Sequence, residues 1–249
     1  MIKVVISGCL GKMGRVVKEV ISTRNDCEVI AGIDVASVKD YDFTVCQKPC
    51  ELDEKPDVII DFSHPSALDD LLEYALTNNC ALVLASTGYN SEQITKIRSS
   101  ALQVPIFFTA NMSLGINLLC ELAKKAATVL GGQFDIEIVE RHHNQKLDAP
   151  SGTALMLADA INEECDNAYN YVYDRHSVRQ KRDKAEIGIH SVRGGTIVGD
   201  HDVIFAGRDE VITLSHSAAS KEVFAVGAVN AAVFMANKPA GLYSMADMI

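Results

Sequence analysis

Apolar and polar residues alternate in blocks along the first part of the chain. Short continuous apolar runs are typical of buried strands, and the stretches between them repeat apolar residues every three or four positions, as amphipathic helices do. The pattern predicts strands at 3–7, 28–33, 57–62, 81–85 and 104–109, and helices at 12–23, 65–78 and 91–101. Strands that alternate with helices in this way predict a parallel sheet covered by helices on both faces.

The pattern changes after residue 113. It predicts a long amphipathic helix at 114–130, a half-buried strand at 135–140 and a helix at 153–164. After a polar stretch come three strand candidates, at 186–192, 196–205 and 210–217, with glycines in the turns between them. Such strands predict a mixed or antiparallel sheet. A last helix, at 221–236, is rich in alanine and valine and is expected to return to the first domain.

The composition is ordinary for a globular protein, with 48% hydrophobic and 22% charged residues among 249. No apolar run approaches the roughly 20 residues of a membrane span, and the first apolar run is too short for a signal peptide. We therefore expect a cytoplasmic protein with no membrane partner. The net charge of −10 argues against a nucleic-acid partner, because it would repel phosphates.

Two further groups of residues are interpreted structurally. The seven cysteines are scattered and include no C-x-x-C pair, so we expect reduced thiols, several of them in the core, and no disulfide framework. The one basic cluster, at 175–184, includes Arg179, Lys181, Arg182 and Lys184 and is interrupted by Asp183. We interpret this cluster as a solvated loop.

The segment between the first expected strand and helix is rich in glycine. It reads Gly8-Cys9-Leu10-Gly11-Lys12-Met13-Gly14, with Leu10 where the commoner G-x-G-x-x-G pattern has its middle glycine. Glycines let the backbone turn tightly and approach a pyrophosphate, and the helix start supplies N–H groups and a positive dipole end. Asp34 closes the second strand, 20 residues after Gly14, where an acidic side chain can bind the adenosine ribose hydroxyls. A plain glycine-rich turn is the alternative for the loop alone, but the whole arrangement predicts dinucleotide binding.

These observations predict an α/β protein with two domains. Residues 1–112 with 221–249 are expected to form an N-terminal Rossmann-type dinucleotide-binding domain. Residues 113–220 are expected to form a second α+β domain built on a mixed sheet, which would bind the substrate and make the oligomer. We expect an oligomer because open sheet faces often pair between subunits.

The most unusual stretch runs E-R-H-H-N-Q-K-L-D-A-P-S-G-T-A, from Glu140 to Ala154. His142, His143 and Lys146 fall within five residues, just after an expected strand. Histidine exchanges a proton near neutral pH, and lysine adds a positive charge or acts as the acid itself. Ser151-Gly152-Thr153 opens a helix, whose first N–H groups attract anions. The segment therefore predicts a proton donor beside a carboxylate site.

A solvated polar loop and a metal site are the other interpretations of this segment. A metal site would need further ligands at a useful spacing. The remaining histidines are dispersed, so no metal is expected: His64, His176, His190, His201 and His216.

The segment from Glu140 to Ala154 resembles the signature of the 4-hydroxy-tetrahydrodipicolinate reductase (dihydrodipicolinate reductase) family, E-x-H-H-x-x-K-x-D-x-P-S-G-T-A. The resemblance covers most of the chain, including the Met-Gly ending of the glycine loop. Other segments similar to this family are Asp61-Phe62-Ser63 followed by Pro65, Ser86-Thr87-Gly88, Ala110-Asn111-Met112-Ser113-Leu114-Gly115, Arg193-Gly194-Gly195 and Gly199-Asp200-His201. The chain departs from the family at Ala85, where glycine is common, and at Val35, where many members have arginine.

The resemblance implies a role for each matching residue. His142 would be the catalytic acid/base and Lys146 the proton donor, while His143 and the backbone N–H groups of Gly152 and Thr153 would hold substrate carboxylates. The implied cofactor contacts are Gly8, Cys9, Leu10, Gly11, Lys12, Met13, Asp34, Ala85, Ser86, Thr87, Thr109, Ala110, Asn111 and Met112. The implied reaction is reduction of 4-hydroxy-tetrahydrodipicolinate to tetrahydrodipicolinate by hydride transfer from NAD(P)H, in diaminopimelate and lysine biosynthesis. The implied assembly is a homotetramer.

The residues around Asp34 predict that NADH is preferred and that NADPH is also usable. The Asp34 carboxylate suits two ribose hydroxyls and repels a 2′-phosphate, and Val35 offers no guanidinium to offset the repulsion. The nearest downstream base is Lys39, and Lys12 in the glycine loop could reach over the adenosine.

Two rival functions are weighed against this one. Another two-domain dehydrogenase of an amino-acid-derived substrate, such as aspartate or diaminopimelate, would share the Rossmann half but lack the His-His-x-x-Lys loop. A non-catalytic NAD(H)-sensing regulator would keep the glycine loop and Asp34 but would need no paired histidine and lysine.

Overall fold

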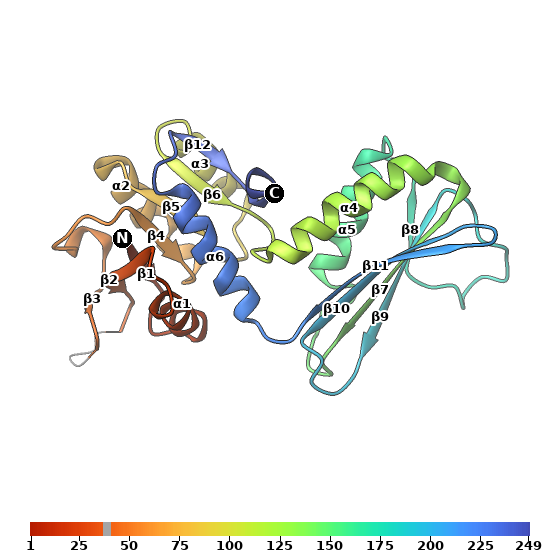
Figure 1. Cartoon of the computed structure of the whole chain (residues 1–249), viewed down its shortest axis with the longest axis horizontal. Helices are drawn as coiled ribbons and strands as arrows, with labels where there is room; N and C mark the ends of the chain where they lie inside the picture. Colours follow the sequence, from red (N-terminus) through yellow and green to blue (C-terminus); the bar gives the residue numbers. More distant parts are fainter. Residues whose placement is uncertain (37–40) are drawn as a thin grey trace. The chain divides into compact units, whose positions relative to one another are not determined.

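The chain folds into two compact units in the computed structural model, which describes residues 1–36 and 41–249. The first unit comprises Met1–Ser113 and Glu222–Ile249, and the second comprises Leu114–Lys221 (Figure 1). The chain therefore leaves the first unit after Ser113 and returns to it at Glu222. Each unit has its own sheet and its own hydrophobic core.

The first unit is built on a parallel sheet with the strand order β12-β6-β5-β4-β1-β2-β3. Its strands are β1 Ile2–Ser7, β2 Cys27–Ile33, β3 Thr44–Cys46, β4 Val58–Asp61, β5 Ala81–Leu84, β6 Pro105–Phe108 and β12 Gly241–Tyr243. Its helices are α1 Lys12–Ser22, α2 Leu68–Asn78, α3 Ser91–Ser100 and α6 Glu222–Met235, with 3₁₀ turns η1 Pro49–Glu51, η2 Pro65–Ala67 and η4 Met245–Met248. The expected Rossmann-type parallel sheet is confirmed. The strands β3 and β12 were not predicted, because three residues are too few to show a strand pattern of apolar and polar positions.

Alternate residues of the buried strands enter different cores, which is why these strands are apolar throughout. Val4 and Ile6 of β1 pack in a core with α1 and α6, while Val5 packs in a core with α2 and α3. The small residues of α6 allow a close approach, since a side chain at Gly227 would overlap the carbonyl oxygen of Met112. Helices therefore cover both faces of the sheet (Figure 1).

The second unit contains a mixed five-stranded sheet with the order β11-β10-β7-β9-β8. Its elements are α4 Leu114–Leu130, η3 Gly131–Gln133, β7 Asp135–His142, α5 Gly152–Glu164, β8 Asn170–Val172, β9 Glu186–Arg193, β10 Gly199–Ala206 and β11 Val211–Ala218. The pairs β7–β9 and β8–β9 are parallel, and the pairs β10–β7 and β10–β11 are antiparallel. The expected mixed sheet is confirmed, but β9 and β10 do not pair across Gly194-Gly195, because β7 lies between them.

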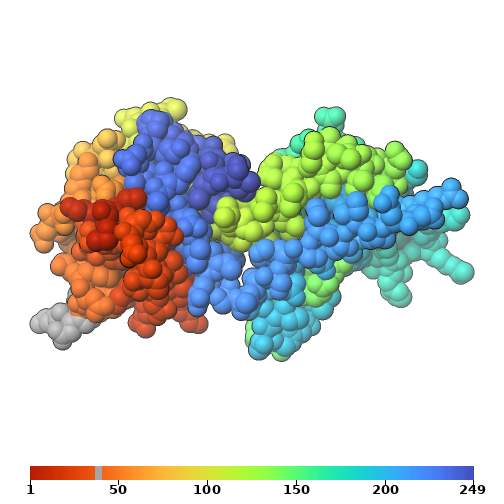
Figure 2. Space-filling model, in the orientation of Figure 1, coloured from red at the N-terminus to blue at the C-terminus, as the bar shows by residue number. Residues whose placement is uncertain are grey.

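One face of this sheet is covered by α4 and α5 and the other is not. Ile138, Ile187 and Val203 point into the core beneath the two helices and are fully buried. The opposite face carries the half-buried and exposed positions of β7, β10 and β11. Figure 2 shows β11, in blue, along the surface of this unit beside the green α4.

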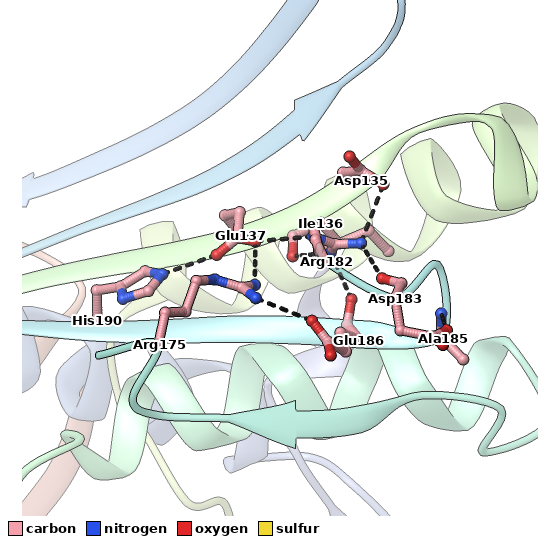
Figure 3. A network of polar contacts seen from close by, with 9 residues as sticks. All are labelled: Asp135, Ile136, Glu137, Arg175, Arg182, Asp183, Ala185, Glu186 and His190. Atoms are coloured by element: carbon pink, nitrogen blue, oxygen red, sulfur yellow. Dashed lines mark hydrogen bonds and ion pairs between the residues drawn. The ribbon is translucent and has the colours of Figure 1, made fainter. Parts of the chain in front are cut away.

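Two arginines of the basic cluster are bound to the sheet, so the interpretation of the cluster as a solvated loop is wrong for them (Figure 3). Arg175 bonds to Glu137 at 2.7 Å and to Glu186 at 2.9 Å. Arg182 bonds to Glu137 at 2.9 Å and to Asp135 at 3.0 Å, and it also donates to two backbone carbonyls of the sheet. Burial raises the pKa of Glu137, but the hydrogen bonds and charges of its cationic partners outweigh burial and lower it overall. The interpretation holds for the exposed members Arg179, Lys181 and Lys184.

The seven cysteines are all unpaired. Five are buried, Cys165 is half-buried and Cys50 is exposed. Apart from Cys50 and Cys165, they therefore act as small core residues, as several were expected to do.

Candidate active site

The glycine loop joins β1 to α1 with no room for side chains at two positions. Gly8 has a φ of +78°, and a Cβ there would lie 2.8 Å from the carbonyl oxygen of Phe62. A Cβ at Gly14 would overlap the carbonyl oxygen of Gly8. Gly11 is the N-cap of α1 and has no side chain to cap its N–H groups. The loop is therefore a bare backbone cradle at a helix start, which fits the phosphates of a dinucleotide.

Asp34 is tied to this cradle. Its Oδ2 accepts a hydrogen bond from the backbone N–H of Leu10 at 3.0 Å, and its Oδ1 accepts one from Ala36 at 3.3 Å. The Cys9 side chain is buried against Gly32, so only the Cys9 backbone faces outward from the loop. Val35 is 91% exposed beside Asp34. Lys12 and Gly11 are exposed, Met13 is half-buried, and Lys39 lies outside the described residues.

The other predicted cofactor residues follow β5 and β6 at the carboxyl edge of the same parallel sheet. Nucleotides bind at this edge in folds of this type. Ala85, Ser86 and Thr87 follow β5, and Thr109, Ala110, Asn111 and Met112 follow β6. Met112 is an exception among these residues, because its side chain is buried in the core and can offer a ligand little but its backbone.

Asp61, at the carboxyl end of β4, organises this edge and was not predicted as a site residue. It is buried, and it accepts hydrogen bonds from Ser63, Ser86 at 2.7 Å and Tyr89 at 3.2 Å. Burial and the Asp61 charge raise the pKa of the Tyr89 hydroxyl, which therefore stays protonated and donates. The available signal was the Asp-Phe-Ser sequence directly after a buried apolar strand.

In the second unit, Glu140 and His142 lie two residues apart on β7 and point to the same, helix-covered side. His142 Nδ1 lies 2.6 Å from Glu140 Oε2. Arg193 on β9 binds both oxygens of the same carboxylate, at 2.8 and 2.7 Å. Burial raises the pKa of Glu140, but hydrogen bonds from Arg193, Ser191 and His142 outweigh burial and bring it to about 2. Glu140 is therefore ionised at neutral pH.

The start of α5 is attached to this cluster. The Ser151 N–H donates to Glu140 Oε1 at 3.1 Å, and the Ser151 hydroxyl accepts from the N–H of Ala154, which caps the helix. The Ser151 hydroxyl also lies 3.0 Å from Nε2 of His201 on β10. Burial, with a smaller contribution from the charge of His142, lowers the pKa of His201 to about 4. A neutral His201 thus stands beside the helix start.

The sequence of this chain matches family models along nearly its whole length. The model of the dihydrodipicolinate reductase N-terminus matches residues 2–112, and the model of the C-terminus matches residues 115–249. The chain belongs to the dihydrodipicolinate reductase family.

Comparison with individual proteins supports this assignment. The 4-hydroxy-tetrahydrodipicolinate reductase of Caldanaerobacter subterraneus subsp. tengcongensis is 51% identical over 100% of this chain and 98% of its own. The dipicolinate-bound dihydrodipicolinate reductase of Paenisporosarcina sp. TG-14 matches all of both chains, with a TM-score of 0.82 and 27% identity. A DAP dehydrogenase of C. glutamicum matches with a TM-score of 0.55 and 14% identity, which shows a shared fold alone.

The structure places the remaining predicted residues of the reductase signature on the loop after β7 and at the start of α5. Lys146 Nζ pairs with Asp148 at 2.9 Å, and the Lys146 N–H bonds to the His143 carbonyl at 3.2 Å. Gly152 and Thr153 form the first turn of α5. Glu140 thus connects His142 to the start of α5 through hydrogen bonds, whereas Lys146 forms an ion pair with Asp148.

The described residues contain no group of three or more potential ligands that could hold a metal ion. In the same part of the chain, no helix is both long and apolar enough to cross a membrane.

Proposed function

We propose that the chain reduces 4-hydroxy-tetrahydrodipicolinate to tetrahydrodipicolinate with NAD(P)H, in diaminopimelate and lysine biosynthesis. The observation that carries the proposal is the His142–Glu140–Ser151 arrangement, which puts a proton-exchanging ring beside a helix start in a chain of this family. Neither rival function needs that arrangement. The chain resembles the DAP dehydrogenase only in its fold. A sensor protein would not need a histidine that is fixed by a carboxylate.

The first unit would hold the dinucleotide along the carboxyl edge of its sheet. Gly8, Gly11 and the helix start would take the pyrophosphate, and Asp34 would accept from the adenosine ribose hydroxyls. The segments after β5 and β6, namely 85–87 and 109–112, would line the nicotinamide half. The bare backbone at Gly8 and Gly14 supports this proposal, since side chains there would fill the cradle.

The exposed Val35 supports a preference for NADH. Asp34 would repel a 2′-phosphate, and its neighbour in the sequence offers no positive charge. Lys12 is exposed and could give NADPH some affinity. We therefore propose that NADH is preferred and that NADPH is usable.

The second unit would hold the substrate. The start of α5 carries the positive end of the helix dipole, and the backbone at Gly152 and Thr153 would bind a carboxylate there, with His143 close by in sequence. The relative from Paenisporosarcina is described as dipicolinate-bound, and dipicolinate is a planar dicarboxylate of this class. Lys146 would add a positive charge to the same site.

The chemistry requires a hydride and a proton on neighbouring carbons. Loss of the 4-hydroxyl group as water converts the substrate to its dihydropyridine form, and bound NAD(P)H would supply the hydride to C4 of that form. The residues of this chain would supply the proton to the adjacent carbon, from His142 or Lys146. Holding both carboxylates would fix the face that the substrate presents.

Two further properties are part of the proposal. The sheet face of the second unit that lacks helices is proposed to pair with other copies in a homotetramer; the exposed Val192 and Val211 support this assignment. A cytoplasmic location is supported by seven unpaired thiols, which suit a reducing compartment.

A coupled assay tests the proposed function. The unstable substrate is generated from pyruvate and aspartate semialdehyde, and oxidation of NADH or NADPH is followed. Turnover above a control without aspartate semialdehyde is expected. Oxidation of diaminopimelate with NADP⁺ instead would support the dehydrogenase, and nucleotide binding without any turnover would support the sensor.

A further inference from the structure

We propose that Glu140 is a positioning residue, held by Arg193, which keeps His142 in one tautomer and one orientation during the reaction. The proposal rests on the proposed function for its chemistry, with His142 as the proton donor. Its geometry lies entirely within the second unit.

The carboxylate of Glu140 is fully engaged. Oε2 accepts from His142 Nδ1 and Arg193, and Oε1 accepts from Arg193 and the Ser151 N–H. An ionised carboxylate only accepts hydrogen bonds, so the short contact at 2.6 Å requires a proton on Nδ1 of His142. Nε2 is then the atom that gains and loses the catalytic proton.

The His142 ring is also held in place by its packing. A Cβ at Gly199 would lie 3.1 Å from Nε2 of His142, so this glycine leaves room for the ring. The His201 ring packs edge-on against His142, with centroids 5.2 Å apart. Because burial keeps His201 neutral at pH 7, it adds no competing positive charge beside His142.

Among the described residues, the Glu140 carboxylate is the only anionic group that is hydrogen-bonded to His142. Arg193 on β9 balances the Glu140 charge, and His201 on β10 is neutral. His216 lies opposite His201 on β11, and burial lowers its pKa as well. In the loop after β7, Lys146 is paired with Asp148.

This orientation of His142 determines how the proton is transferred. The imidazolium of His142 gives its Nε2 proton to the substrate carbon next to the hydride acceptor, and the ring becomes neutral with its Nδ1 proton still bonded to Glu140. A proton from the bulk solvent later returns to Nε2. Without the carboxylate, a neutral ring can carry its proton on either nitrogen and can turn, so fewer molecules are ready to react.

A purely structural role for Glu140 is the competing explanation, and the chain contains a matched control. Glu137 lies on the same strand and is bound by Arg175, Arg182 and His190, but on the other face of the sheet. Glu140→Gln and Glu137→Gln therefore each remove one carboxylate that binds arginine and histidine. Only Glu140→Gln affects His142.

Steady-state kinetics across pH separate the two explanations. Glu140→Gln is expected to lower kcat on the order of 10²-fold with nucleotide affinity unchanged. The alkaline limb of its profile of kcat against pH should move to lower pH, because loss of the neighbouring negative charge disfavours the imidazolium. Glu137→Gln should keep the wild-type limb. In a His142→Gln background, adding Glu140→Gln should change kcat less than about 3-fold, since the residue that it positions is gone.

If the alkaline limbs of the Glu140→Gln and wild-type profiles lie at the same pH, the proposal is overturned. It is also overturned if the losses in kcat from Glu140→Gln and His142→Gln multiply in the double variant. A second measurement needs neither substrate nor a stable variant. Nitrogen NMR of histidine-labelled wild type should show neutral His142 protonated on Nδ1, and protonation on Nε2 would contradict the proposal. If the wild type fails to reduce the substrate but shows the Nδ1 tautomer, the proposed function is wrong while the positioning geometry stands.

Discussion

Glu137 and Glu140 lie three residues apart on β7, so their carboxylates leave opposite faces of the sheet, and each is bound by arginine and histidine. On the helix-covered face, Glu140 is buried and its histidine is the predicted acid/base, His142. On the other face, Glu137 fixes the loop that carries Arg175 and Arg182 (Figure 3). The same combination of groups thus orients a reactive ring on one side and anchors a loop on the other.

The Glu137 network predicts a stability defect without a catalytic defect. Arg182→Ala removes bonds to two carboxylates and three carbonyls from a largely buried side chain. The free energy of unfolding in urea should fall by about 2–3 kcal/mol, because buried acceptors lose charged donors. Arg208→Ala is the matched control, since Arg208 is almost fully exposed and its partner Asp209 is too. An unchanged urea midpoint in Arg182→Ala would show that the network adds nothing to stability.

His142→Gln tests the acid directly. The kcat for the reduction should fall by roughly 10²–10⁴-fold, while NADH affinity barely changes, because the residues proposed to bind the nucleotide belong to the first unit. Lys146→Ala should reduce kcat comparably and raise KM, since it removes a positive charge proposed to face a carboxylate. His176→Gln changes an exposed histidine and should leave both constants unaltered. Near-wild-type turnover in His142→Gln would remove His142 from the mechanism.

Much of the first unit could be predicted from the sequence because its signals are local. Continuous apolar runs marked the buried strands, and Gly8 to Gly14 marked a turn that excludes side chains. The Glu140 to Ala154 segment was identified for the same reason, since its histidines, lysine and helix start are contiguous.

The features that were missed depend on partners far away in the chain. Glu140 acquires its positioning role from Arg193, 53 residues later. Arg182 was interpreted as solvated because its partner Glu137 lies 45 residues earlier. The insertion of β7 between β9 and β10 is likewise a choice of strand partner, which no local pattern of polarity specifies.

Asp61→Asn should weaken nucleotide binding without affecting the second unit. The amide would place a donor where Ser63, Ser86 or Tyr89 now donates, and the segment after β5 would lose its anchor. We expect the NADH dissociation constant, measured by fluorescence titration, to rise about 10-fold, which corresponds to about 1.4 kcal/mol. Asp57→Asn alters the opposite end of β4, where Asp57 accepts from the Lys3 N–H, and should leave the affinity alone. Equal affinities in both variants would deny Asp61 this role.

The buried His201 predicts a particular loss of stability in acid. Its pKa falls from 6.5 in the unfolded chain to about 4 in the folded one, chiefly through burial. As pH drops through this window the unfolded chain takes up a proton that folded His201 does not, so the free energy of unfolding decreases, by at most about 1.4 kcal/mol per pH unit. Urea titrations of His201→Gln between those limits should show a shallower pH dependence than wild type. The exposed His176→Gln should keep the wild-type slope, and an unaltered slope in His201→Gln would mean that His201 titrates normally.

The cofactor preference can be decided at Val35. Asp34 is held by the glycine loop through Leu10, so its carboxylate cannot easily turn away from a 2′-phosphate. Val35→Arg places a guanidinium beside that carboxylate at a position that is 91% exposed, so the substitution should not disturb packing. The ratio of kcat/KM values should shift toward NADPH on the order of 10-fold, and more at low ionic strength, where an exposed charge is less screened. Val35→Gln is the matched control, because it adds length and polarity without charge and should shift the ratio little. A clear NADPH preference in the wild type would mean that Lys12 or Lys39 outweighs Asp34, and Lys12→Ala should abolish that preference if Lys12 is the residue responsible.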